Sequence, residues 1–173
     1  MYIIYIVLII AFLVVATIGW AAFSFAPWLP MHSRDLKRVF ALLALKEGET
    51  FYDLGCGNGK VALYAGKHYD ARVTGLELAL PLLWLCKLRR LLGRQKNVRF
   101  KWRNLFRADL SQADVVYFFG IPSTIKAKLK QKLARELKPG ARVVSYAFQV
   151  DGWQAAAVSK PCKTDIPIYL YVR

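Results

Sequence analysis

The sequence predicts an α/β fold with a doubly wound, mostly parallel sheet and an antiparallel C-terminal strand, preceded by one N-terminal transmembrane helix. Two observations carry this prediction. Short apolar runs alternate with segments of helical periodicity, which is typical of a parallel sheet. The first 30 of the 173 residues contain no charged side chain, so the formal charge of +15 belongs to the remainder. We expect a membrane anchor over residues 1–28 and one domain over residues 29–173.

The N-terminal segment is apolar at nearly every position from Tyr2 to Trp28. A helix needs about 20 apolar residues to cross ~30 Å of hydrocarbon, and this segment is long enough. A cleaved signal peptide is the alternative, because Ala22-Phe23-Ser24 offers small residues at a cleavage-like spacing. No Lys or Arg precedes the apolar run, however, and the run is longer than a usual signal core. We therefore expect a retained single-pass anchor.

Positive charge follows the anchor instead of preceding it. The C-terminal flank carries Arg34, Lys37, Arg38 and Lys46. The positive-inside rule then places the domain on the cytoplasmic side, or on the equivalent inner side of an organelle membrane. A basic domain also suits an anionic membrane surface or nucleic acid, and charge alone does not separate these two partners.

The remaining elements are expected in chain order after the break at Pro27–Pro30. Ser33 is the expected cap of a first helix that ends at Gly48. Lysines 126, 128, 130 and 132 of the last helix are expected to form a solvated face. The expected strands are 50–54, 71–76, 98–102, 114–119, 141–148 and 166–172, and the other expected helices are 60–69, 80–92 and 123–137.

A glycine-rich turn follows the first expected strand. Its sequence is Asp53-Leu54-Gly55-Cys56-Gly57-Asn58-Gly59, in which glycines let the backbone turn tightly and approach a ligand. The spacing differs from the dinucleotide fingerprint G-x-G-x-x-G. A phosphate-binding P-loop is excluded, because Leu54 stands where that loop needs glycine and Val61 where it needs Ser or Thr. Asp53 would repel a phosphate and attract a cation.

Glu77 ends the second expected strand. An acidic residue about 20 residues after the glycine turn can accept hydrogen bonds from ribose hydroxyls. The two carboxylates together favour a ligand that contains a ribose and a positive charge but no phosphate. S-adenosylmethionine (SAM), an adenosine that bears a sulfonium, has this composition.

The glycine turn resembles motif I of the class I (seven-β-strand) SAM-dependent methyltransferases, which have a Rossmann-like fold, and Glu77 matches their acidic residue after the second strand. Asn104, in Arg103-Asn104-Leu105-Phe106, stands at the position that contacts the adenine amino group in this class, where Asp is more usual. The cofactor-binding residues that the resemblance implies are Asp53, Gly55, Cys56, Gly57, Asn58, Gly59, Glu77, Asn104 and Leu105, together with Trp28 and Pro30 of the flanking segment.

Four flanking segments resemble the small protein-lysine methyltransferases of archaea and, with a membrane anchor, of mitochondria. They are Pro27-Trp28-Leu29-Pro30, Phe119-Gly120-Ile121-Pro122, residues 142–148 and Gly152-Trp153. This resemblance implies a lysine on a membrane-associated protein as the acceptor. A lipid headgroup N-methyltransferase and a non-catalytic SAM-binding membrane adaptor are the alternatives. Enzymes that methylate base or glutamine amines share an Asn/Asp-Pro-Pro-aromatic motif after the fourth strand, and its absence counts against exocyclic base amines as acceptors. Nucleic acid is not expected as a partner.

Methyl transfer to an amine requires alignment of two reactants and exclusion of water, with no nucleophilic side chain. An aromatic channel that keeps the lysine uncharged would suffice. The candidates for this channel are Phe118, Phe119, Pro122, Tyr146, Phe148 and Trp153. No metal is expected, and Cys56, Cys86 and Cys162 form neither a disulfide framework nor a zinc motif.

Overall fold

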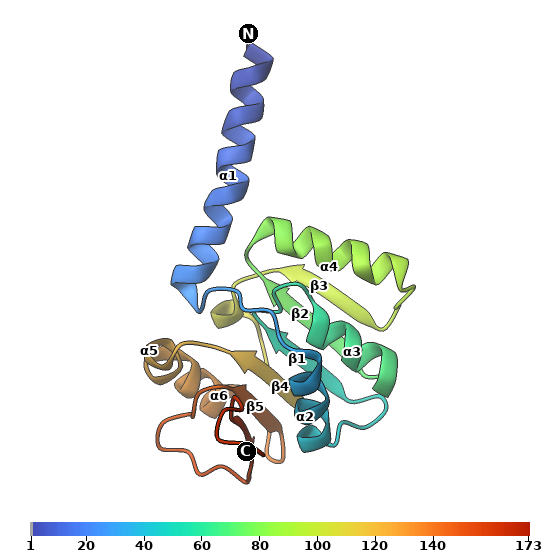
Figure 1. The fold of residues 1–173 in the computed structure, drawn as a ribbon, viewed down its shortest axis with the longest axis vertical. Coiled ribbons are helices and arrows are strands. Elements are labelled where there is room, and N and C mark those ends of the chain that lie inside the picture. Colours follow the sequence, from blue (N-terminus) through green and yellow to red (C-terminus); the bar gives the residue numbers. More distant parts are fainter. Residues whose placement is uncertain (1) are drawn as a thin grey trace.

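The short apolar runs form one seven-stranded sheet in the computed structural model, which describes residues 2–173 (Figure 1). The strands are β1 (Thr50–Leu54), β2 (Arg72–Glu77), β3 (Val98–Trp102), β4 (Val115–Phe119), β5 (Arg142–Tyr146), β6 (Ala157–Ser159) and β7 (Ile168–Val172). The helices are α1 (Tyr2–Ser24), α2 (Ser33–Leu43), α3 (Lys60–Tyr69), α4 (Leu80–Leu92), α5 (Pro122–Thr124) and α6 (Lys130–Glu136), with a 3-10 turn η1 (Leu105–Arg107) and a π-helical turn η2 (Ile125–Leu129).

The strand order is β3-β2-β1-β4-β5-β7-β6. Strands β1 to β5 are parallel, whereas β7 is antiparallel to both of its neighbours, β5 and β6. The predicted fold class is thereby confirmed, including the antiparallel C-terminal strand. The direction of winding reverses between β1 and β4, and ligands bind at such a switch point, beyond the carboxyl ends of the strands. The glycine turn leaves β1 at that point.

Two hydrophobic clusters cover the two faces of the sheet. One is formed with α2 and α3, whose buried side chains include Phe40 and Ala62. The other is formed with the segment from α5 to α6 and includes Leu129 and Leu133. Strand β4 is buried along its first four residues, as a strand covered on both faces should be.

Helix α2 differs from the prediction at both ends. His32 occupies the N-cap position and its side chain makes no capping hydrogen bond, so Ser33 is the first helical residue and not the cap. The helix ends at Leu43, because Ala44 takes a left-handed conformation with φ of 46°. Gly48, which was expected to end the helix, lies in the following turn to β1.

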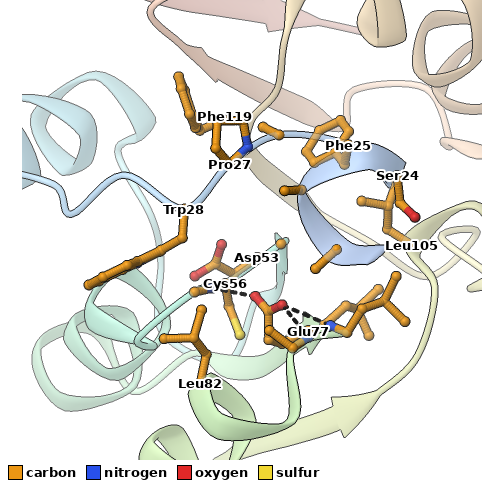
Figure 2. Close-up of a pocket in the computed structure, with 18 of the residues that line it drawn as sticks. Ser24, Phe25, Pro27, Trp28, Asp53, Cys56, Glu77, Leu82, Leu105 and Phe119 are labelled. Atoms are coloured by element: carbon orange, nitrogen blue, oxygen red, sulfur yellow. Dashed lines mark hydrogen bonds between the residues drawn. The ribbon is translucent and has the colours of Figure 1, made fainter. Parts of the chain in front are cut away.

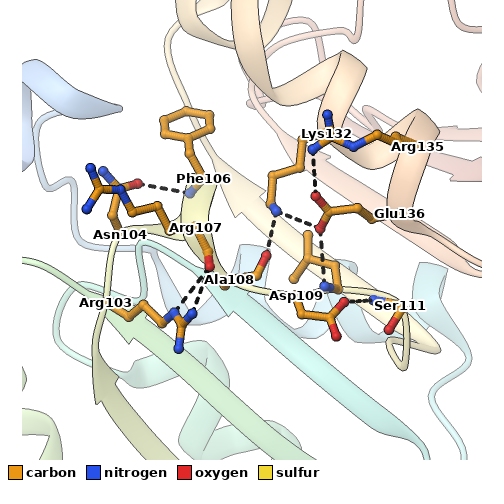
Figure 3. Close-up of polar contacts among 11 residues, drawn as sticks. Arg103, Asn104, Phe106, Arg107, Ala108, Asp109, Ser111, Lys132, Arg135 and Glu136 are labelled. Carbon is orange, nitrogen blue, oxygen red and sulfur yellow. Dashed lines mark hydrogen bonds and ion pairs between the residues drawn. The ribbon is translucent and has the colours of Figure 1, made fainter.

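Lys132 is buried, which contradicts the expected solvated face of this helix (Figure 3). Its Nζ donates to the carbonyl oxygen of Ala108 and, at 2.6 Å, to Oε2 of Glu136. The same Glu136 oxygen accepts the backbone N–H of Leu110 at 3.3 Å. The ion pair between buried Lys132 and partly buried Glu136 therefore attaches α6 to the segment that follows β3.

Helix α1 extends away from the sheet, and only its C-terminal end meets the domain (Figure 1). It is long and apolar enough to cross a membrane, by length and composition. The end of α1 packs against α4, where Oγ1 of Thr17 accepts the backbone N–H of Leu80 at 3.0 Å. Phe25, just past the helix, is buried with its ring edge-on to Phe106 and Phe118. The connection between helix and domain is thus itself packed.

Candidate cofactor site

A cavity of about 270 Å³ lies beyond the carboxyl ends of β1, β2 and β4 (Figure 2). The glycine turn forms one wall, and the segment after β3 forms another. The end of α1 and the linker that follows it close the third side, through residues that include Ala21, Phe25 and Trp28. The volume is close to the lower end of the range usual for small-molecule sites.

Glu77 at the end of β2 accepts three backbone hydrogen bonds, each of 2.8 Å. Oε2 accepts the N–H of Gly57, and Oε1 accepts the N–H groups of Leu78 and Ala79 (Figure 2). Burial raises the pKa of Glu77, and the three N–H donors oppose that rise. The carboxylate therefore has a fixed orientation, and Oε2, which accepts only one of these bonds, keeps acceptor capacity for a ligand hydroxyl.

Asp53 at the end of β1 is 1% exposed. Within residues 2–173, its Oδ2 has no hydrogen-bond partner. Burial, with a smaller contribution from the charge of Glu77, raises the pKa of Asp53 to about 8. An unpaired buried carboxylate oxygen is costly unless a donor or a cation meets it. The cavity thus places two carboxylates together, and Oδ2 of Asp53 is the oxygen that still lacks a partner.

The glycine turn is shaped by what lies against it. Gly55, Gly57 and Gly59 all have positive φ, which other residues rarely adopt. A Cβ on Gly57 would lie 2.3 Å from Cδ1 of Trp28, so glycine is needed there for space as well. The indole ring extends along the cavity beside the turn in Figure 2.

Asn104 lines the cavity and also caps the turn η1. Its Oδ1 accepts the backbone N–H of Phe106 at 2.9 Å (Figure 3). The amide oxygen expected to face the adenine therefore already has one donor, and a second hydrogen bond would use its remaining lone pair. Leu105 follows in the same wall.

Most of the residues predicted to bind the cofactor line the cavity. They are Trp28, Asp53, Gly55, Cys56, Gly57, Asn58, Glu77, Asn104 and Leu105. Gly59 and Pro30 are not among the lining residues. Gly59 is the N-cap of α3, where it packs against Cys86 and Phe100.

The predicted channel residues are less closely grouped. Phe119 is the one that lines the cavity, and Phe148 stacks on it with ring centroids 6.2 Å apart. Tyr146 is buried behind Phe119 and its hydroxyl donates to Asp35 at 2.7 Å. The other candidates lie elsewhere: Phe118 in the core, Pro122 exposed at the start of α5, and Trp153 against Tyr171.

The contribution of the apolar N-terminal segment to the cavity was not predicted from the sequence. Ile18, Ala21 and Ala22 of α1 line it, followed by Phe25. The ring of Phe25 also explains why residue 120 is glycine, since a Cβ at that position would lie 2.5 Å from the ring. The segment is apolar at every turn, so its sequence carries no periodicity that distinguishes the residues that contact the domain.

The sheet order, the glycine turn and the paired carboxylates are those of a class I SAM-dependent methyltransferase. A solved RNA methyltransferase from Salinibacter ruber, in complex with S-adenosyl-L-homocysteine, has the same architecture. It superposes with a TM-score of 0.77 at 29% identity, over 83% of this chain and 93% of that one. The cofactor is SAM.

Residues 53–157 match the family described as the ANTKMT methyltransferase domain, and the chain belongs to that family. A protein-lysine N-methyltransferase of Saccharolobus islandicus is 31% identical over 153 residues, which are 84% of this chain and 92% of the relative.

Two mouse proteins are similar over a smaller share of their own length. The adenine nucleotide translocase lysine N-methyltransferase is 33% identical over 76% of this chain and 57% of the relative. A second lysine N-methyltransferase, named for a subunit of ATP synthase, is 30% identical over 73% of this chain and 51% of the relative. The chain thus spans little more than half the length of these mouse relatives.

Proposed function

We propose that this protein is a membrane-anchored methyltransferase that transfers the methyl group of SAM to lysine side chains of a membrane-associated protein. Three relatives support the acceptor, because all are lysine N-methyltransferases by name. The names of the two mouse relatives specify a translocase and a subunit of ATP synthase. The long apolar helix α1 supports the anchor.

The residues present fit the cofactor. Glu77 would accept from the ribose hydroxyls, with its carboxylate already oriented by Gly57, Leu78 and Ala79. The unpartnered Oδ2 of Asp53 would face the positively charged portion of the ligand. Asn104 and Leu105 would contact the adenine. When bound, SAM supplies an electrophilic methyl group on a positively charged sulfur.

The observation that carries the proposal is that α1 forms part of the cavity wall. Ile18, Ala21 and Ala22 line the same cavity as Asp53 and Glu77. If α1 spans a bilayer, the reacting lysine must reach the cavity close to the membrane surface. Holding enzyme and acceptor in one membrane also raises their effective concentration without any new contact.

The residues beside the proposed acceptor path are apolar. Phe119, Phe25 and Pro27 lie on the same side of the cavity in Figure 2, away from Glu77. Apolar surroundings disfavour the charged form of an amine and so lower the pKa of a lysine. We infer that these residues hold the lysine in its neutral form and in line with the methyl group, which is most of what this reaction requires.

The basic flank of α1 supports an inward-facing domain. Arg34, Lys37 and Arg38 follow the apolar helix. By the positive-inside rule, we propose that the domain lies on the cytoplasmic side or the equivalent inner side of an organelle membrane.

Radiolabelled SAM tests the proposed acceptor. Membranes that contain the full-length protein would be labelled, and label in protein, lipid and RNA would be counted separately. The proposal predicts label in protein, with methyl-lysine found by mass spectrometry and lost in the variant Asp53→Asn. Label in lipid would instead support a headgroup methyltransferase, label in RNA an RNA methyltransferase, and SAM binding with no label in any fraction a non-catalytic adaptor.

A further inference from the structure

Helix α4 has an apolar stripe on its outer face. Trp84, Leu88, Leu91 and Leu92 recur at spacings of four, seven and eight residues, which places them on one side of the helix. All four are more than half exposed. The opposite side packs on the sheet through Leu83 and Cys86, so the stripe is not part of the core of the domain.

Basic residues surround this stripe without any acidic ones. Between Glu77 and Asp109 the sequence has nine Lys and Arg and no Asp or Glu. Lys87, Arg89 and Arg94 are exposed on or just after α4, as is Lys101 on the neighbouring edge strand β3. A shallow groove beside the helix is lined by Lys87 and Arg90 together with Leu88, Leu91 and Phe100. Positive charge and exposed leucine thus occur on the same surface.

Helix α4 also lies beside the base of α1. The two helices pack together, with the hydrogen bond from Leu80 to Thr17 at the contact. In Figure 1, α4 runs across the edge of the domain on the side toward which α1 rises. If α1 spans a bilayer, α4 is therefore the domain helix nearest to the membrane surface.

We infer that the outer face of α4 is a membrane-docking surface that lies on anionic phospholipid. Trp84 and the three leucines enter the interface between headgroups and acyl chains, as the apolar face of an interfacial helix does. The lysine and arginine side chains contact the lipid phosphates, each adding about 1 kcal/mol when close to the surface. This inference rests on the proposed anchor, because α1 brings the stripe to the membrane.

Docking of α4 would hold the cavity at a fixed height above the bilayer. Ala79 and Leu82, at the start of α4, line the cavity. Arg89 donates to the carbonyl oxygen of Asn58 in the glycine turn at 3.1 Å. Helix α4 therefore contacts the cofactor site directly as well as the lipid. Any tilt of the domain on its linker would move α4 and the cavity together.

Spin-label accessibility in the full-length protein tests this surface. In a Cys162→Ser background, which removes the exposed thiol, one label is placed at Leu88→Cys and a matched label at Gln131→Cys, an exposed position on α6. The protein is reconstituted in nanodiscs of phosphatidylcholine alone or mixed with phosphatidylglycerol. Relative accessibility to oxygen and to a water-soluble nickel chelate then reports the depth of each label.

The inference predicts that the label at 88 lies below the phosphates in the anionic discs and that the label at 131 stays in water. The double variant Lys87→Gln and Arg94→Gln should reduce the docked population about fivefold for each charge removed, through loss of phosphate contacts. A label at 88 that remains in water in anionic discs would overturn the inference, and so would a label shielded from both reagents by a second protein copy. Failure of the protein to enter discs would instead contradict the proposed anchor.

Discussion

The indole ring of Trp28 lies against the backbone of Gly57, so closely that a Cβ on the glycine would come within 2.3 Å of Cδ1 of the ring. Trp28 belongs to the linker that follows α1, whereas Gly57 belongs to the turn that follows β1. This contact therefore connects the apolar N-terminal segment to the loop whose N–H group is bonded to Glu77. Any change that separates the two residues should alter the cavity between them.

The variant Gly57→Ala should weaken SAM binding by roughly tenfold or more, which is a loss of about 1.4 kcal/mol. The added methyl group must displace the indole ring, and the positive φ of residue 57 adds its own cost for an L-residue. Isothermal titration calorimetry measures the change. Gly140→Ala is the matched control, because Gly140 also has positive φ but its Cβ would meet open space. Unchanged affinity in Gly57→Ala would show that the ring does not lie on the turn in solution.

The affinity of the wild-type protein for SAM should rise with pH up to about 8 and then level off. Asp53, with a pKa of about 8 before binding, must lose its proton to meet a cationic ligand. Calorimetry at pH 7 in two buffers of different ionisation enthalpy should therefore detect release of close to one proton per SAM. In Asp53→Asn, binding should be weaker and should lose this pH dependence. Parallel pH profiles for the two proteins would remove Asp53 from the site.

The stability of the ligand-free Asp53→Asn variant should exceed that of the wild type at pH 8. The pKa of Asp53 is raised from 3.8 to about 8 in the folded protein, so the folded state holds a proton that the unfolded chain has released. Stability of the wild type therefore falls as pH rises between these values, and the variant escapes that loss. Thermal unfolding across this range measures it. A wild type more stable than the variant at pH 8 would contradict the unpaired, buried state of Asp53.

The variant Glu77→Gln should lose both stability and cofactor affinity. An amide has one oxygen where the carboxylate has two, so at least one of the N–H groups of Gly57, Leu78 and Ala79 loses its acceptor. A buried donor without a partner costs about 1–3 kcal/mol. Thermal unfolding and calorimetry should both report the loss. Retention of wild-type affinity would show that Glu77 does not contact the ligand.

Glu136→Gln is the counterpart that should lower stability without changing SAM affinity. Glu136→Gln removes the charged partner of the buried Lys132 ammonium, which keeps only the carbonyl oxygen of Ala108 and a neutral amide as acceptors, and loss of a charged hydrogen-bond partner costs about 1.5–3 kcal/mol. The pair lies outside the cavity lining. Denaturant unfolding should detect the loss, and titration with SAM at low temperature should give the wild-type dissociation constant. A weaker affinity in this variant would indicate that α6 helps to shape the site.

Phe119→Ala should reduce the rate of methyl transfer by roughly 100-fold, the effect of a small misplacement of a reactant. The ring is the predicted channel residue that reaches the cavity. Tyr146→Phe is the control, because it removes only the hydroxyl that donates to Asp35 and should lower stability while turnover is kept. Incorporation of label from SAM into membrane protein measures both. Equal loss of turnover in the two variants would place the acceptor channel deeper, along β5.

The sequence was sufficient to predict the elements whose boundaries are local. Strand β1, strand β3 and helices α3 and α4 begin and end where glycine, proline and apolar runs indicate. The meeting of Asp53 and Glu77 was also predictable, because parallel strands place their carboxyl ends at one edge of the sheet.

Other features depend on contacts between distant segments, which no local pattern reports. Strand β6 has three residues and exists through its pairing with β7. The burial of Lys132 depends on its hydrogen bond to Ala108. The position of the Tyr146 hydroxyl depends on its hydrogen bond to Asp35 in α2. The position of Phe25 in the cavity wall could not be predicted, because a uniformly apolar segment does not indicate which of its sides contacts the domain.

A structure of the protein with SAM bound is the decisive test of the proposed cofactor site. We expect the ribose hydroxyls within hydrogen-bond distance of Glu77 and the positively charged portion of the ligand facing Oδ2 of Asp53, beside the ring of Trp28. A cofactor found outside this cavity, or bound with its ribose and its positive charge away from both carboxylates, would contradict it.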